Sequence, residues 1–398
     1  MSSSYLERLE RTARAHQDWR TKECLNLIPS ENRGSAQMRS MFLSDLGNRY
    51  TAPDRFYRGT KFADELVSIT EELARKVFNA RYADVRPLSG HTADMAVLLS
   101  LTEAGDRVLS VDPANGGYPG ITHLGIGSIL KLKNEYFAYD DEAVNIDARG
   151  SEPLMAGPKV VFFGSSYIPF PHPARALSSM ADGVCVYDAS HVLGLVAGGE
   201  FQDPLREGCS LMVGSTHKSF PGPQGGIILS NDAEVFARVS GKIFPGIVDN
   251  IHLDRVAALA VALVEMMQFG KPYAQAVVKN SRALARALAD EGIKVRGASQ
   301  GYSSSHQVLL DYDQARLKPL SVRLEQANII VDEAGRVGTA EVTRMGYGPG
   351  EMETVAELMA MVILGKKAPD LVQKKVRTLV KQFQQPRFVL SSPPRLTE

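Results

Sequence analysis

The segment Val184-Cys-Val-Tyr-Asp-Ala-Ser-His191 is a short apolar run that ends in an acidic residue, Asp188. A second segment, Val213-Gly-Ser-Thr-His-Lys-Ser-Phe-Pro-Gly-Pro-Gln-Gly-Gly226, places Lys218 after another apolar run. Apolar runs without alternation are typical of strands buried on both faces, as in a parallel sheet covered by helices. Ligands of such sheets bind outside the carboxyl ends of the strands. The two segments therefore predict an α/β fold with a site near Asp188 and Lys218.

Similar runs and helical periodicities extend on both sides of these segments. The strands that we expect lie at residues 108–111, 160–163, 184–187, 212–213, 227–229, 308–310 and 329–331. The helices that we expect lie at residues 5–19, 64–79, from 92 onward, 251–269, 274–291 and 353–364. Strands that alternate with helices favour a mostly parallel sheet sandwiched by helices, followed by a smaller α+β region.

A chain of 398 residues usually forms more than one domain. We expect an N-terminal arm over 1–45, a large domain over 46–250, and a small C-terminal domain with its linking helix over 251–385. The remaining tail, 386–398, contains three prolines and is expected to be irregular.

The composition limits the classes of partner. Lysine plus arginine (45) balances aspartate plus glutamate (45), which gives no reason to expect nucleic acid or an anionic membrane surface. Three scattered cysteines do not form a zinc cluster or a disulfide framework, so we expect no metal site. The charged N-terminus has no apolar signal region, and no run is apolar enough to span a membrane. We therefore expect a cytoplasmic protein.

Three pieces of sequence together indicate chemistry that none indicates alone. A Ser89-Gly90 turn that opens a helix offers backbone N–H groups to a phosphate. A carboxylate such as Asp188 can keep a pyridine nitrogen protonated, and Lys218 can form a Schiff base. Each piece also has a structural interpretation, as a capped helix, a capped turn and a solvated lysine. Their combination, in this order, favours pyridoxal 5'-phosphate (PLP) as the cofactor.

At this point the sequence resembles the serine hydroxymethyltransferase family of fold-type I PLP enzymes. The resemblance extends from about Leu25 to Leu364. It is carried by Leu27-Ile-Pro-Ser-Glu-Asn32, the twelve residues from Asp188 to Gly199, Ser215-Thr-His-Lys218 with Gly222-Pro-Gln-Gly-Gly226, and Gly335-Arg-Val-Gly-Thr339. These motifs are highly specific for the superfamily and fairly specific for the family.

The resemblance implies a set of roles around the cofactor ring. Lys218 would form the Schiff base, with His217 beside the cofactor. Asp188 would pair with the pyridine nitrogen and His191 would lie near the ring oxygen. Ser165 would contact the ring hydroxyl.

It also implies roles at the phosphate, the ring face and the substrate. Ser89 and Gly90 would hold the phosphate, and His91 would also contact the cofactor. Tyr118 stands where the family has a histidine that stacks on the ring, and an aromatic side chain can still stack there. Arg336 would bind the α-carboxylate of the substrate, helped by Ser30, because a guanidinium fork fits a carboxylate. Tyr50 and Tyr57 match the active-site tyrosines of the family, one of which reaches across a dimer interface. Without the resemblance, Arg336 would be read as a surface ion pair, Ser30 as a turn or helix cap, and the tyrosines as packing residues.

Departures from the family pattern cluster around the expected active site. The stretch between Tyr50 and Tyr57 is shorter than in the family and lacks its catalytic glutamate, with Asp54 as its only carboxylate. That glutamate serves transfer of the one-carbon unit to tetrahydrofolate, which brings the use of this second cofactor into question. Gln224 stands where the family has arginine, and residues 247–250 replace a Gly-Gly pair. We therefore expect an altered substrate or acceptor on a retained PLP scaffold.

The function expected from these residues is the making and breaking of the Cα–Cβ bond of a β-hydroxy amino acid. The partners would be a small amino acid and an aldehyde, in a homodimer with shared active sites. Serine hydroxymethyl transfer, threonine-type cleavage and transaldolase activity all belong to this chemistry. The alternatives are a PLP-dependent aminotransferase or racemase, and a degenerate PLP-binding scaffold without catalysis.

Overall fold

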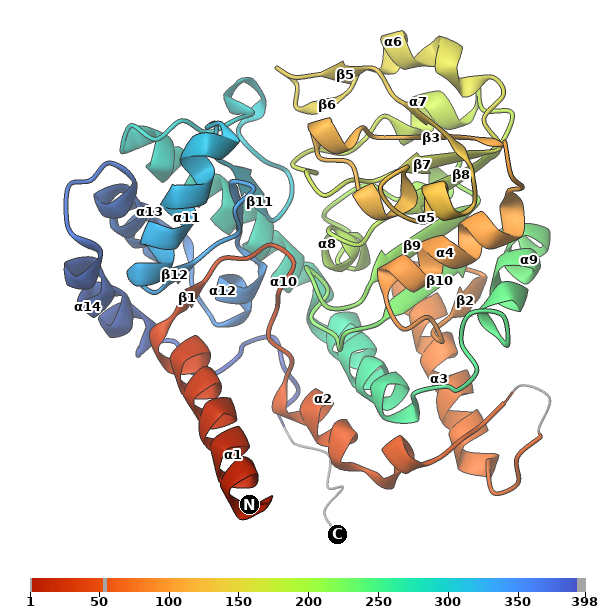
Figure 1. Cartoon of the computed structure of the whole chain (residues 1–398), viewed down its shortest axis with the longest axis horizontal. Coiled ribbons are helices and arrows are strands. Elements are labelled where there is room, and N and C mark those ends of the chain that lie inside the picture. The colour runs from red at the N-terminus through yellow and green to blue at the C-terminus, as the bar shows by residue number, and fades with distance from the viewer. Residues whose placement is uncertain (1, 53–55, 392–398) are drawn as a thin grey trace. The chain divides into compact units, whose positions relative to one another are not determined.

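The chain divides into two compact units in the computed structural model, which describes residues 2–52 and 56–391 (Figure 1). One unit joins Met1–Glu31 to Ala276–Arg387, and the other joins Asn32–Gln275 to Phe388–Glu398. The domain limits proposed from the sequence stay a prediction. Each unit is described below by itself.

A seven-stranded sheet forms the centre of the unit that contains Lys218. Its strands, in spatial order, are β2 (Tyr82–Asp84), β10 (Gly226–Ser230), β9 (Leu211–Ser215), β8 (Val184–Asp188), β7 (Val160–Phe163), β3 (Arg107–Ser110) and β4 (Lys133–Tyr136). All run parallel except β10, which pairs antiparallel with both β2 and β9. This confirms the mostly parallel sheet that the sequence predicts.

The apolar runs form fully buried strands, as the sequence predicts. β7, β9 and β10 are buried along their whole length. Helices cover the sheet on both faces (Figure 1). The longer ones are α3 (Lys61–Phe78), α4 (Gly90–Leu101) and α9 (Ala233–Ile243). The shorter helices and strands of this unit are α2 (Ala36–Ser40), α5 (Ile126–Ile129), β5 (Tyr139–Asp140), β6 (Asn145–Ile146), α6 (Ala148–Ser151), α7 (Ala174–Ser178) and α8 (Leu193–Ala197).

Parallel strands bring their carboxyl ends to one edge of the sheet. Asp84, Asp188 and Ser215 are the last residues of β2, β8 and β9, which run in the same direction. The connections that follow these strands contain Ser89, His191 and Lys218. The fold therefore collects the three predicted pieces of the cofactor site at a single edge.

The other unit is a smaller α+β assembly. It contains the parallel pair β1 (Leu25–Asn26) and β12 (Ile329–Ile330), and the antiparallel pair β11 (Gln307–Leu309) and β13 (Arg336–Gly338). Its helices are α1 (Ser2–Asp18), α11 (Gln314–Gln326), α12 (Ala340–Arg344), α13 (Pro349–Ile363) and α14 (Pro369–Val380). A buried apolar core that includes Leu25, Ile329 and Val337 joins the N-terminal strand to the C-terminal elements.

One helix prediction is wrong. The two helices expected at 251–269 and 274–291 are a single helix, α10 (Leu253–Asp290), with Pro272 inside it. A proline removes one backbone donor and crowds the preceding turn, which often ends a helix. Here the helix continues because the residues that follow, Tyr273, Ala274 and Val277, are fully buried. Their burial outweighs the local cost of the proline.

Two kinds of feature are absent from the described residues. Over 2–52 and 56–391, no helix combines the length and apolar character needed to cross a bilayer. Within the same ranges, no cluster of histidine, cysteine and acidic side chains has a geometry that could hold a metal ion.

Candidate active site

A cavity of about 220 Å³ lies at the carboxyl edge of the sheet. Its lining residues come from the turns after five strands and from the start of α4: Ser89, Gly90, His91, Asp94, Tyr118, Ser165, Ser166, Asp188, Ser190, His191, Ser215 and Lys218. Most of the cofactor residues predicted from the sequence are in this set. The structure thus brings together the predicted lysine, acid and phosphate turn.

The N-terminus of α4 forms one wall of the cavity. Ser89 is the N-cap, and its Oγ accepts a hydrogen bond of 3.0 Å from the N–H of Thr92. The first-turn N–H groups of Gly90 and His91 have no acceptor within the helix, and the helix dipole makes this end positive. A phosphate group at this point would receive both N–H groups.

Two glycines allow close contact between the Ser89-Gly90 turn and the adjoining ends of β9 and β10. A Cβ on Gly226, at the start of β10, would collide with the carbonyl oxygen of Ser89. The N–H of Gly226 also donates to the carbonyl of Pro87 at 2.9 Å. A Cβ on Gly90 would lie only 2.5 Å from the Oγ of Ser215. Any side chain at these glycines would therefore displace the turn that faces the cavity.

Side chains from distant parts of the chain hold the backbone at Lys218 and Ser219, in the connection between β9 and β10. The Nδ2 of Asn32 donates to the carbonyl of Lys218 at 2.8 Å and to the hydroxyl oxygen of Tyr273 at 2.9 Å. The hydroxyl of Tyr273 in turn donates to the carbonyl of Ser219 at 2.8 Å. Sequence reasoning quoted Asn32 only as the end of a motif and did not single out Tyr273. No local signal predicts these roles, because both arise from tertiary contacts.

Two carboxyl groups face the cavity. The Oδ1 of Asp188 accepts a hydrogen bond of 2.8 Å from the N–H of Ser190. Asp94, on α4, is almost fully buried, and burial raises the pKa of its carboxyl well above the usual value, with Asp188 raising it further and Lys218 opposing this shift. Asp94 was not predicted as a site residue. Its spacing of four residues from Gly90, which places both on one helix face, is the signal that could have found it.

Aromatic and imidazole side chains complete the walls. The rings of His91 and Tyr118 lie edge to face, with their centroids 5.9 Å apart. Burial raises the pKa of Tyr118 to about 12, with contributions from Asp94 and Asp188, so its phenol stays protonated. His191 is buried in the cavity wall. His217 is not part of the lining, and burial next to the charge of Lys218 lowers its pKa to about 4.

The hydroxyl of Ser165 lies next to a buried, neutral histidine, His172. The Ser165 hydroxyl donates to the carbonyl of Tyr167, and its Oγ lies 3.4 Å from the Nε2 of His172. Burial lowers the pKa of His172 to about 3, so the imidazole is uncharged. The Nδ1 of His172 lies 2.9 Å from the Oδ1 of Asn145, which also accepts from the N–H of Ile146. An acceptor at this position favours the tautomer with the proton on Nδ1. Sequence reasoning did not identify His172.

Besides His217, four predicted site residues lie outside this cavity. Tyr50 and Tyr57 pack on each other with ring centroids 5.3 Å apart, and their exposed fractions are 50% and 36%. Ser30 and Arg336 belong to the other unit. There the guanidinium of Arg336 forms an ion pair of 2.8 Å with Asp332. Asp54, the carboxylate noted between the tyrosines, lies outside the described residues.

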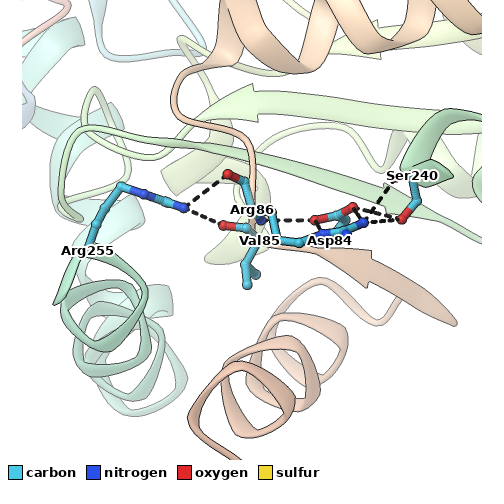
Figure 2. A network of polar contacts seen from close by, with 5 residues as sticks. All are labelled: Asp84, Val85, Arg86, Ser240 and Arg255. Atoms are coloured by element: carbon cyan, nitrogen blue, oxygen red, sulfur yellow. Dashed lines mark hydrogen bonds and ion pairs between the residues drawn. The ribbon is translucent and has the colours of Figure 1, made fainter. Parts of the chain in front are cut away.

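A second polar network lies at the end of β2 (Figure 2). Asp84 accepts hydrogen bonds from the backbone N–H, Nε and Nη2 of Arg86 and from the hydroxyl of Ser240. The Nη2 of Arg255 donates to the backbone carbonyls of Val85 and Arg86. These contacts fix the backbone just before the phosphate turn at Ser89.

A second cavity, of about 330 Å³, is larger than the first but has different chemistry. Its lining residues are Thr51, Ala52, Asp64, Val67, Glu71, Arg86 and Ile251. This set contains no lysine to form a Schiff base, and its one cation, Arg86, is already paired with Asp84. Size therefore does not identify the active site, and we assign the smaller cavity on its chemistry.

The residues of the smaller cavity fit PLP. The N-terminus of α4 suits the phosphate, Asp188 suits a protonated pyridine nitrogen, and Lys218 supplies the amine. Tyr118 offers an aromatic face to the ring. Gly90 and Gly226 let the backbone segments of the cavity wall pack against one another, which fixes the turn at the phosphate position.

Comparison with known proteins gives consistent results. The family model described as "Serine hydroxymethyltransferase" matches residues 10–359. The chain is 40% identical to a serine hydroxymethyltransferase from Methanopyrus kandleri, over 96% of this chain and 94% of the relative. It is 40% identical to one from Pyrococcus abyssi, over 91% of each chain, and 39% identical to one from Saccharolobus islandicus, over 96% and 94%.

A solved structure has a similar fold. It is the L-threonine transaldolase from Pseudomonas fluorescens, in its internal aldimine state. The TM-score is 0.91, and the match covers 98% of this chain and 94% of that one. The sequence identity is 24%, so this likeness concerns the fold alone.

Proposed function

Because the chain belongs to the serine hydroxymethyltransferase family, we propose that it is a PLP-dependent enzyme whose Lys218 carries the cofactor in the smaller cavity. Its reaction makes or breaks the Cα–Cβ bond of a β-hydroxy amino acid. The observation that carries the assignment of residues is that Lys218, Asp188 and the Ser89-Gly90 turn line one cavity. When bound, PLP withdraws electrons from the bond that is broken at Cα.

We propose that the residues of the cavity divide the work by their chemistry. The N–H groups at the start of α4 bind the phosphate, and the carboxylate of Asp188 holds a proton on the pyridine nitrogen. Tyr118 and His91 exclude water from the face of the ring. Asn32 and Tyr273 hold the backbone of Lys218, which keeps its amine directed to one place.

Trapping the cofactor tests this proposal. Borohydride reduction of the protein with PLP, followed by peptide mapping, should locate a pyridoxyl group on Lys218. The variant Lys218→Arg keeps the charge but should give no adduct. A reduced adduct on another lysine, or on none, would contradict the assignment.

For the substrate we propose a small amino acid with a β-hydroxyl group, fixed through its α-carboxylate by Arg336 with help from Ser30. A guanidinium fork supports this role for Arg336. The guanidinium of Arg336 is paired with Asp332, and the substrate carboxylate would have to replace this partner. The variant Arg336→Lys should raise the KM for serine or threonine more than it lowers kcat, while PLP affinity stays unchanged.

We further propose that the aldehyde is transferred without tetrahydrofolate. The support is the shortened stretch between Tyr50 and Tyr57, which lacks the glutamate of the family pattern. Cleavage of serine and of threonine should be measured with and without tetrahydrofolate. Aldehyde release that is unchanged by the folate supports the proposal, and a large enhancement of serine cleavage by the folate overturns it. Release of a keto acid would instead indicate transamination.

A homodimer with shared active sites is part of the proposal. Its support is an aromatic cluster with large exposed fractions: 50% for Tyr50, 75% for Phe56 and 36% for Tyr57. Exposed aromatic clusters are typical of interfaces. If Tyr57 acts in the site of a second copy, mixing Lys218→Ala with Tyr57→Ala should restore about a quarter of the wild-type activity. No restoration, despite exchange of subunits, would show that the sites are not shared.

Cytosol is the compartment that we propose. All three cysteines, Cys24, Cys185 and Cys209, are buried and unpaired thiols. Free thiols are typical of a reducing compartment. Fractionation of the native cells, with detection of the protein by antibody, tests this location.

A further inference from the structure

Asp94 is a buried carboxyl in the wall of the cofactor cavity to which the proposed function assigns no role. Its side chain has an exposed fraction of 1%. Within the described part of the chain, its Oδ1 is buried and has no hydrogen-bond partner. An ionised carboxylate needs donors or water around its oxygens, and burial without them favours the protonated acid.

Asp188 shares the same cavity and has the better environment for a negative charge. It is less deeply buried than Asp94, and its Oδ1 accepts the N–H of Ser190 at 2.8 Å. Two carboxylates in one small cavity cannot both ionise without a large cost, so one of them keeps its proton. The carboxylate of Asp188 accepts a backbone N–H, whereas the Oδ1 of Asp94 has no hydrogen-bond partner in the described part of the chain. The proton therefore belongs on Asp94.

The other groups around Asp94 agree with this assignment. Burial, and secondly Asp188, raise the pKa of Asp94, while the ammonium of Lys218 opposes the shift. The remaining titratable groups that line the cavity are His91, His191 and Tyr118.

We propose that Asp94 is a neutral carboxylic acid that donates a hydrogen bond to the carboxylate of Asp188, so that the two side chains hold one negative charge between them. This inference rests on the proposed function, in which Asp188 faces the pyridine nitrogen. The hydrogen bond spreads the charge of Asp188 and makes it a weaker base toward that nitrogen. Asp94 is thus a positioning residue, which acts through Asp188.

Infrared spectroscopy tests the protonation state without catalysis. The difference spectrum between the wild-type apoprotein and Asp94→Asn should contain the C=O band of a protonated carboxyl at about pH 8, above the usual pKa of aspartate. The band should persist after PLP is added. Its absence at this pH, in both apo and PLP-bound protein, would show that Asp94 is ionised and would overturn the proposal.

Matched variants test the hydrogen bond. The amide of Asp94→Asn can still donate to Asp188, so PLP affinity should stay within about threefold of wild type. Asp94→Ala removes the donor and should weaken PLP binding about tenfold or more, since hydrogen bonds to charged groups are among the stronger ones. The pH at which the bound chromophore changes its absorption should shift in Asp94→Ala and not in Asp94→Asn. Equal losses in the two variants, or no loss in either, would contradict the proposal.

The two levels of inference can fail separately. If wild-type protein formed no adduct at Lys218, the proposed function would fail, whatever the infrared spectrum showed. If wild-type protein bound PLP at Lys218 but the carboxyl band were absent, only the role of Asp94 would fail. Thermal unfolding of the apo variants shows whether a loss of PLP affinity reflects loss of the fold.

Discussion

Asp84 and Asp188 end strands of the same sheet at the same edge, yet their surroundings differ. Asp84 is fully surrounded by donors: the backbone and guanidinium of Arg86 and the hydroxyl of Ser240 (Figure 2). Asp188 accepts from the N–H of Ser190 and otherwise faces a cavity shared with Asp94 and Lys218. Satisfied carboxylates support a fold, whereas carboxyls that lack donors are available to a ligand. Position on the sheet alone does not separate these two roles.

The largest expected effect comes from the open carboxylate. Asp188→Ala should lower kcat/KM for β-hydroxy amino acid cleavage by about 10³-fold, because the proposed partner of the pyridine nitrogen is lost. The free energy of unfolding of the apoprotein, from urea titration, should stay nearly unchanged. Asp188→Asn, which keeps the volume, should show a similar loss of activity. If either Asp188 variant instead lost its fold, Asp188 would be a structural carboxylate like Asp84.

The satisfied carboxylate should respond in the opposite way. Asp84→Asn should lower the free energy of unfolding by about 3 kcal/mol, because it leaves the largely buried guanidinium of Arg86 without its partner. Urea titration measures this loss. Adding Arg86→Met should recover part of it, since the pair is then removed together. If the double variant were no more stable than Asp84→Asn, the ion pair would not explain the effect.

Next in size is a pH effect from Glu71, which lines the larger cavity beside this network. Burial, and secondly Asp84, raise the pKa of Glu71 from 4.5 to about 7. The folded protein therefore keeps a proton that the unfolded chain releases, and the free energy of unfolding falls as pH rises between these values. Glu71→Gln should remove this slope and stabilise the protein by about 2 kcal/mol above pH 7.

The matched control for Glu71 is its neighbour Glu72. Glu72 is exposed and forms an ion pair of 2.6 Å with Lys76 on the helix surface. The Lys76 ammonium lowers the pKa of Glu72, so Glu72→Gln should leave the pH dependence of unfolding between pH 4.5 and about 7 as it is in the wild type. If both substitutions removed the same slope, the effect would come from net charge and not from the buried position.

The smallest expected effect concerns one hydroxyl. The Oγ of Ser240 donates to Asp84 at 2.7 Å and accepts from the Nη2 of Arg86 at 2.8 Å. Ser240→Ala should cost about 1 kcal/mol in the free energy of unfolding and leave PLP affinity unchanged. Ser179→Ala is the control, because Ser179 makes one exposed bond of 3.3 Å to the carbonyl of Ala176. If both substitutions lowered the free energy of unfolding equally, the network around Asp84 would make no particular contribution to stability.

Much of the large unit could be predicted from the sequence because its signals are local. The run at Val160–Phe163 is a strand with the predicted bounds, since a buried parallel strand needs only consecutive apolar residues. Lys218, Asp188 and Ser89 could be predicted because each follows such a run or opens a helix. The convergence of these residues then follows from the direction of the strands.

Other features depend on tertiary contacts that no short segment encodes. Asp94 shares a helix face with Gly90, but the sequence does not show that Asp94 is buried in the same cavity as Asp188, so the second carboxyl was missed. Pro272 reads as a helix end, and only the burial of the residues after it shows that α10 continues. The short strand at Arg336–Gly338 has too few residues between its glycines to be predicted as one. The roles of Arg336 and Ser30 remain predictions.

Gly226 and the carbonyl of Ser89 meet without a side chain between them. Saturation mutagenesis at position 226 should therefore recover only glycine among variants that retain the cofactor, although Gly226 does not line the cavity. Redesign of the proposed phosphate site therefore has to change both segments together. Variants in which the Ser89 turn and the start of β10 are changed independently of one another should mostly be inactive.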